Sequence, residues 1–167
     1  MQAEAVSEKK IQRAIKLSRL NGWSVAGFAG LCAVVVLPLG SFFGFVVGCA
    51  VALSGIMELR GHALLKQRRL SSIPWLIGSQ IYLIVVLWAY ASYNIMHFDA
   101  ENPWARFSPG FKDLILSINP DVYLVEAMLK ISYYATYFSL IIAVLLYQGG
   151  LCLYYLSRKK YLYAEGE

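Results

Sequence analysis

Charged residues are scarce in this chain of 167 residues: Asp, Glu, Lys and Arg make up 15% of it, against about 25% in soluble domains. Three stretches contain no Asp, Glu, Lys, Arg or His at all: Leu20–Met57 with 38 residues, Leu70–Met96 with 27 and Ile131–Ser157 with 27. Since a helix needs about 20 apolar residues to cross a bilayer, these runs exclude a soluble domain, a disordered chain and a coiled coil. The sequence predicts an all-α integral membrane protein.

Cysteine and histidine are also rare. The three cysteines, Cys32, Cys49 and Cys152, lie inside the apolar runs, which excludes a disulfide scaffold. The sequence contains no HExxH zinc signature, no glycine-rich phosphate loop and no CxxC motif. We therefore expect no cofactor and no enzymatic activity.

The longest apolar run must turn back on itself. As one helix its 38 residues would measure about 57 Å, nearly two hydrocarbon cores of about 30 Å. Pro38 and Gly40 mark a turn near its middle. The sequence thus predicts one membrane domain, 1–167, folded as a bundle of four transmembrane helices with a tight hairpin between the first two. The predicted spans are 23–39, 42–57, 74–96 and 131–157.

Basic residues flank these spans unevenly. Twelve of the fifteen lie in segments 1–21, 58–69 and 158–167, and only three lie in the connection 97–130. Because positive flanks stay in the cytoplasm, we expect a cell membrane protein, inner or plasma, with both termini cytoplasmic and 97–130 outside. The net charge of +5 then reflects orientation and contact with anionic lipid headgroups rather than nucleic acid.

Two segments outside the spans have helical signatures. Residues 1–21 mix apolar residues with five basic ones, which predicts an amphipathic helix on the cytoplasmic leaflet. In the outer connection 97–130, Ser108–Pro109 is a helix start signal before apolar residues at helical spacing, which predicts a short interfacial helix. Asn119–Asp121 repeats the signal, so the fourth helix should begin near Pro120.

Three ionisable residues end the second predicted span: Glu58, Arg60 and His62. We interpret them as a helix end reaching water, with Gly61 ending the helix and the two basic side chains beside its last carbonyls. An acid is unfavourable at that end of a helix, so Glu58 should have a basic partner, Arg68 or Arg69. The alternative is an acid–base site in which Glu58 and His62 act on lipid headgroups.

A weak metal pattern lies in the outer connection. The alternating residues His97, Asp99 and Glu101 would share one side of an extended segment, and these types bind divalent cations. We expect no metal, because a full site needs more ligands and supporting groups than this pattern supplies.

Small residues repeat every four positions along the second span: Gly40, Gly44, Gly48 and Ala52. This spacing lets helix backbones approach closely. The stripe either packs on the first span within the hairpin or meets another subunit.

Polar side chains form stripes on the third and fourth spans: Gln80, Tyr90, Asn94, Ser132, Tyr133, Thr136, Tyr137, Ser139, Tyr147 and Gln148. On a helical wheel of the fourth span, the polar residues occupy one half and the other half is nearly all apolar. This predicts that the polar half faces the bundle interior or a partner and the apolar half faces lipid. Gln80 and Gln148 lie at similar depths, so their amides could meet.

These features favour a non-enzymatic four-span subunit that packs into a homo- or hetero-oligomeric membrane assembly. Its expected partners are membrane lipids and either a second copy or another membrane protein. An oligomeric channel or small transporter with a weakly polar path is the alternative, and a lipid-headgroup enzyme is the third interpretation.

Overall fold

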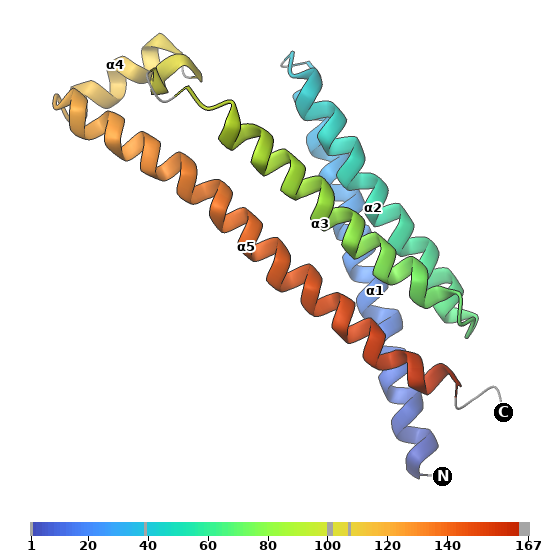
Figure 1. Cartoon of the computed structure of the whole chain (residues 1–167). Coiled ribbons are helices and arrows are strands. Elements are labelled where there is room, and N and C mark those ends of the chain that lie inside the picture. The colour runs from blue at the N-terminus through green and yellow to red at the C-terminus, as the bar shows by residue number, and fades with distance from the viewer. Residues whose placement is uncertain (1, 39, 100–101, 107, 164–167) are drawn as a thin grey trace. The chain divides into compact units, whose positions relative to one another are not determined.

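The computed structural model describes residues 2–38, 40–99, 102–106 and 108–163, and every regular element in them is helical. Along this part of the chain the order is α1 (Gln2–Val36), α2 (Phe42–Lys66), α3 (Ser72–Met96), the 3-10 helix η1 (Pro103–Arg106), α4 (Pro109–Ile118) and α5 (Val122–Tyr163) (Figure 1). Four helices, α1, α2, α3 and α5, are long and apolar enough to cross a membrane. The predicted all-helical class is confirmed, and the number of helices that could cross a membrane equals the four predicted spans.

The chain divides into two compact units, and the division passes through α3 and α5. The first unit, 1–87 with 144–167, contains α1, α2, the first part of α3 and the last part of α5. The second unit, 88–143, contains the end of α3, η1, α4 and the beginning of α5. The core of the first unit is a cluster of Ile11, Ala14, Leu65, Ile73, Leu76, Leu151, Tyr155 and Leu162.

Helix α1 differs from the prediction, because it joins the amino-terminal segment and the first span without a break. Residues 1–21 therefore do not form a separate helix ahead of the span. Ile11 and Ala14 are each 1% exposed and belong to the same core cluster as Leu65. The apolar side of this segment packs on the protein, which explains why the helix continues straight through Gly22.

Helices α1 and α2 pack closely through small residues. A Cβ built at Gly48 would lie 2.8 Å from the Cβ of Ala33, and one built at Gly55 would lie 2.5 Å from the backbone nitrogen of Ala26. Neither site has room for a side chain, so these glycines let the two backbones approach.

The predicted small-residue stripe is therefore divided between two roles. Gly44 and Gly48 lie against α1, and Ala52 is partly buried. Gly40 lies in the turn, with a φ of +77° that favours glycine, and nothing lies within 4 Å of its added Cβ. After the turn, the Ser41 hydroxyl accepts a hydrogen bond from the Gly44 amide at 3.2 Å and caps α2.

The sequence predicted that helix α2 ends at Gly61. This prediction is wrong, because the helix continues to Lys66. Gly61 is buried, and a Cβ there would lie 2.8 Å from the side chain of Leu76 in α3. The helix ends where Arg68 adopts a φ of +58° and the Arg69 amide donates to the Leu64 carbonyl at 3.1 Å. This is the usual geometry of a helix end, so Gly61 serves packing instead.

The second unit follows the predicted start signals with small shifts. Pro109 is the first residue of α4, but the Ser108 side chain makes no capping hydrogen bond. Helix α5 begins at Val122, because the Asp121 carboxylate accepts a hydrogen bond from the Leu124 amide at 3.1 Å. The cap is thus Asp121, two residues later than the predicted cap.

Candidate functional site

A buried carboxyl group lies at the centre of the first unit. Glu58 of α2 is only 2% exposed. Its Oε2 accepts a hydrogen bond of 2.6 Å from the Asn21 side-chain amide of α1, and its Oε1 accepts one of 2.8 Å from the Tyr155 hydroxyl of α5. One carboxyl group thus connects α2 to α1 and α5.

The polar network extends outward from Asn21. The Tyr147 hydroxyl donates to the Asn21 carbonyl oxygen at 3.2 Å, so both ends of this amide are engaged. Gln80 and Gln148 are buried, at 1% and 6% exposed, but among the described residues their amides do not bond to each other. The predicted hydrogen bond between them is wrong, because Gln80 Nε2 donates to the neighbouring Ser79 hydroxyl at 3.2 Å instead.

The structure does not join the predicted cluster of Glu58, Arg60 and His62. The Arg60 guanidinium lies 4.3 Å from the ring centroid of Trp75. The His62 Nδ1 lies 3.0 Å from the Ile15 carbonyl oxygen and 3.3 Å from the Ser18 hydroxyl. Each of the three side chains therefore has different neighbours.

The expected basic partner of Glu58 is also wrong. Arg68 forms an ion pair with Glu8 near the amino terminus of α1. Because α2 continues past Gly61, Glu58 lies two turns inside the helix, where it faces Asn21 and Tyr155 rather than solvent. Neutral donors hold both of its oxygens.

This arrangement favours a structural junction over acid–base chemistry. A carboxyl group whose two oxygens accept hydrogen bonds from side chains on different helices fixes the register of those helices. Buried polar networks of this kind are costly unless their members find partners, so they favour one packing over others. The Glu58 network therefore fixes α1, α2 and α5 of the first unit relative to one another.

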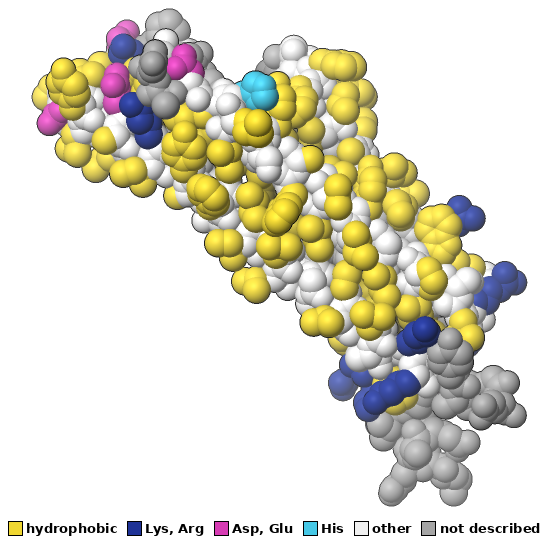
Figure 2. Space-filling view, viewed as in Figure 1, with side chains coloured by type: hydrophobic (Ala, Val, Ile, Leu, Met, Phe, Trp, Pro, Cys, Tyr) yellow, Lys and Arg dark blue, Asp and Glu magenta, His cyan; other side chains and the backbone are white. Residues whose placement is uncertain are grey.

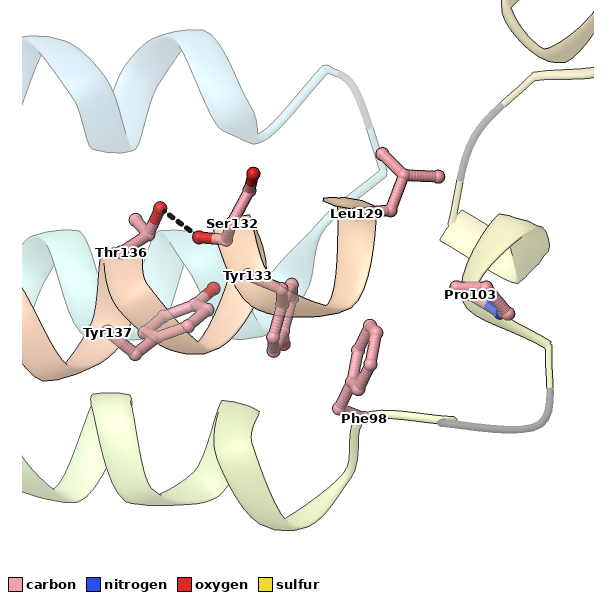
Figure 3. A pocket seen from close by; sticks show the side chains of 7 residues that line it. All are labelled: Phe98, Pro103, Leu129, Ser132, Tyr133, Thr136 and Tyr137. Carbon is pink, nitrogen blue, oxygen red and sulfur yellow. Dashed lines mark hydrogen bonds between the residues drawn. The ribbon is translucent and has the colours of Figure 1, made fainter. Parts of the chain in front are cut away.

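In the second unit, Phe98 after the end of α3 and the rings of Tyr133 and Tyr137 at the beginning of α5 line a pocket of about 240 Å³ (Figure 3). The Tyr133 hydroxyl donates to the Asn94 carbonyl at 3.0 Å, and the Tyr133 ring stacks on Phe98 with centroids 4.1 Å apart. The Tyr137 and Tyr90 rings are tilted against each other, with centroids 6.0 Å apart. These contacts bring together four of the predicted polar or aromatic positions.

The predicted polar face of α5 is split by this packing. Tyr133 and Tyr137 are partly buried toward α3, whereas Ser132, Thr136 and Ser139 are exposed. The Thr136 hydroxyl donates to the Ser132 carbonyl at 2.7 Å (Figure 3). The hydroxyl-bearing side of α5 therefore stays exposed, with Ser132 and Thr136 also lining the pocket.

The weak metal pattern gains no support in the part of the chain that the structure describes, where no group of three His, Cys, Asp or Glu side chains is placed to hold a metal. The His97 ring stacks on Tyr93 at 4.1 Å, and Asp99 accepts a hydrogen bond from the Asn102 amide at 3.0 Å. Glu101 lies outside the described residues.

Sequence reasoning missed Asn21 and Tyr155 as partners of Glu58. One signal was present: Glu58 follows Gly48 and Gly55 by ten and three residues, which places it near the packing side of the same helix. An acid on such a side lies inside a bundle.

Comparison of the chain with protein-family models, with curated proteins and with solved structures finds no match in any of the three.

Proposed function

We propose that this protein is a non-enzymatic membrane subunit that associates with a second copy of itself through α5. The supporting observation is a stripe of small and hydroxyl-bearing residues in the second unit. This α5 stripe consists of Ser132, Thr136, Ser139 and Ala143, all exposed and spaced by four, three and four residues along one side of the helix.

Membrane helices associate where small residues let backbones approach, because lipid supplies little hydrophobic driving force between them. The comparable stripe on α2 is already occupied, since Gly44 and Gly48 lie against α1. The α5 stripe is exposed, and Phe138 and Ile142 on another side of α5 are 54% and 57% exposed and apolar. We assign the apolar side to lipid and the α5 stripe to the partner.

The proposed setting is a cell membrane, inner or plasma, with both termini cytoplasmic. Its support is the uneven distribution of basic residues, twelve of fifteen in the three segments assigned to the cytoplasm. Figure 2 shows Lys and Arg side chains gathered at the end of the first unit that carries the α2–α3 connection. In the second unit, α4 is an interfacial helix in this proposal, because Leu114 and Ile118 are 57% and 75% exposed.

Disulfide cross-linking in native membranes tests the association. In a variant without Cys32, Cys49 and Cys152, a single cysteine is introduced as Ala143→Cys or, as a control, Phe138→Cys. Two copies related by a twofold axis bring the same position of the stripe together. We expect oxidation to yield a covalent dimer from Ala143→Cys and little from Phe138→Cys.

Equal cross-linking at both positions would indicate random collision and contradict the proposal. Absence of a dimer at Ala143→Cys together with abundant dimer at Phe138→Cys would place the interface on the apolar side instead. Thr136→Cys provides a second position on the stripe, seven residues from Ala143, and should cross-link as well.

A further inference from the structure

We propose that the first unit binds the phosphate group of an anionic phospholipid in a basic pocket between α1 and α2. The pocket has a volume of about 330 Å³, within the range of small-molecule sites. It is lined by Gln12, Ile15, Lys16, Arg19, His62 and Lys66. Two helices thus bring three permanently basic side chains to one cavity.

These charges are not neutralised within the described part of the chain. No hydrogen bond or ion pair engages Lys16, Arg19 or Lys66 there. Two described acids of the same helices already have partners: Glu8 pairs with Arg68, and Glu58 is buried against Asn21 and Tyr155. An anion entering the pocket would relieve the repulsion among three like charges.

The wall of the pocket is held in place by the protein. The His62 Nδ1 lies 3.0 Å from the Ile15 carbonyl oxygen, and this contact ties α2 to α1 at the pocket. Gln12 is likewise held, because its side-chain amide donates to Glu8 at 2.8 Å. The helix segments that carry the basic side chains are therefore fixed relative to each other before a ligand binds, which lowers the entropic cost of binding.

A neighbouring cavity combines basic and apolar side chains, which points to a lipid as the ligand. A second cavity of about 290 Å³ is lined by Lys16, Arg19, Leu20 and Trp23, so it shares two basic residues with the first. Leu20 is 65% and Trp23 63% exposed. A phosphate held by Lys16 and Arg19 would leave an acyl chain beside these two side chains, a surface that a soluble anion would not use.

Native mass spectrometry of the full chain in mild detergent tests this site. The probes are phosphatidylglycerol, zwitterionic phosphatidylcholine and soluble glycerol phosphate. The pocket variant carries Lys16→Gln, Arg19→Gln and Lys66→Gln. The control variant carries the same charge change at exposed basic residues outside the pocket, Lys9→Gln, Arg13→Gln and Arg69→Gln.

The native chain should retain phosphatidylglycerol in preference to phosphatidylcholine and should not retain glycerol phosphate. Each charge-assisted contact between a basic side chain of the pocket and the phosphate should contribute about tenfold to the affinity, so the pocket variant should lose more than about a hundredfold in affinity. The control variant should lose much less. Equal losses in both variants would mean that general surface charge binds the lipid, and equal binding of glycerol phosphate would mean a site for soluble anions; either result overturns the proposal. Circular dichroism verifies that both variants are folded.

Discussion

A single added methyl group at Gly55 provides a quantitative test of the α1–α2 hairpin. In the Gly55→Ala variant the new Cβ would lie 2.5 Å from the backbone nitrogen of Ala26 and 2.8 Å from the backbone oxygen of Gly22. Backbone atoms cannot rotate away, so the two helices must separate. Overpacking of this kind costs about 1–3 kcal/mol, while alanine gains up to about 1 kcal/mol of helix propensity. We expect a net loss of about 1–2 kcal/mol in the free energy of unfolding.

The matched control is Gly30→Ala in α1, where nothing lies within 4 Å of the added Cβ. Because only the propensity term changes there, this variant should be as stable as the native chain or up to about 1 kcal/mol more stable. Reversible unfolding in mixed micelles with increasing SDS, followed by circular dichroism, measures both. Equal stability of the two variants would refute the close approach of α1 and α2 at Gly55.

Three further predictions concern the buried network and the orientation. Glu58→Ala should lower the free energy of unfolding by about 1–3 kcal/mol in the same SDS titration, since it leaves buried donors without an acceptor. Glu58→Gln should cost less, because it keeps the size of the side chain and one acceptor oxygen; a loss from Glu58→Ala no larger than that from Glu58→Gln would contradict the network. Tyr155→Phe should cost about 1 kcal/mol and Tyr154→Phe almost nothing, because only the first removes a hydroxyl bound to Glu58, and the reverse order would contradict the network. In intact cells, a membrane-impermeant thiol reagent should label Asn102→Cys and not Gln67→Cys on a background without native cysteines; labelling of Gln67→Cys alone would invert the proposed orientation.

The helical class was readable from the sequence because it depends on long runs without charge. Runs of 38, 27 and 27 residues without charge are long enough to cross a bilayer as helices, in which all backbone hydrogen bonds are made within the segment. Helix ends were less predictable. Gly61 has the local character of a helix end, yet contact with Leu76 keeps it inside α2, and a tertiary contact of this kind leaves no local signal.

The polar site was predictable only in part, for the same reason. Glu58 and Asn21 stand 37 positions apart and meet because the hairpin brings α1 and α2 together in a particular register. A helical wheel identified Tyr133 and Ser132 as members of one polar half of α5. It could not show that Tyr133 turns toward α3 while Ser132 stays exposed, because that depends on the direction from which α3 approaches.

The number of copies in each particle tests the central proposal, association through the α5 stripe, most directly. Purified protein in lipid nanodiscs, fluorescently labelled once per chain, is counted by single-molecule photobleaching, with Ala143→Leu as the stripe variant and Phe138→Leu as the control. The account predicts two or more bleaching steps for the native chain and for Phe138→Leu, and a shift toward single steps for Ala143→Leu, whose larger side chain prevents close approach. Single steps for the native chain, or an unchanged distribution in Ala143→Leu, would contradict it.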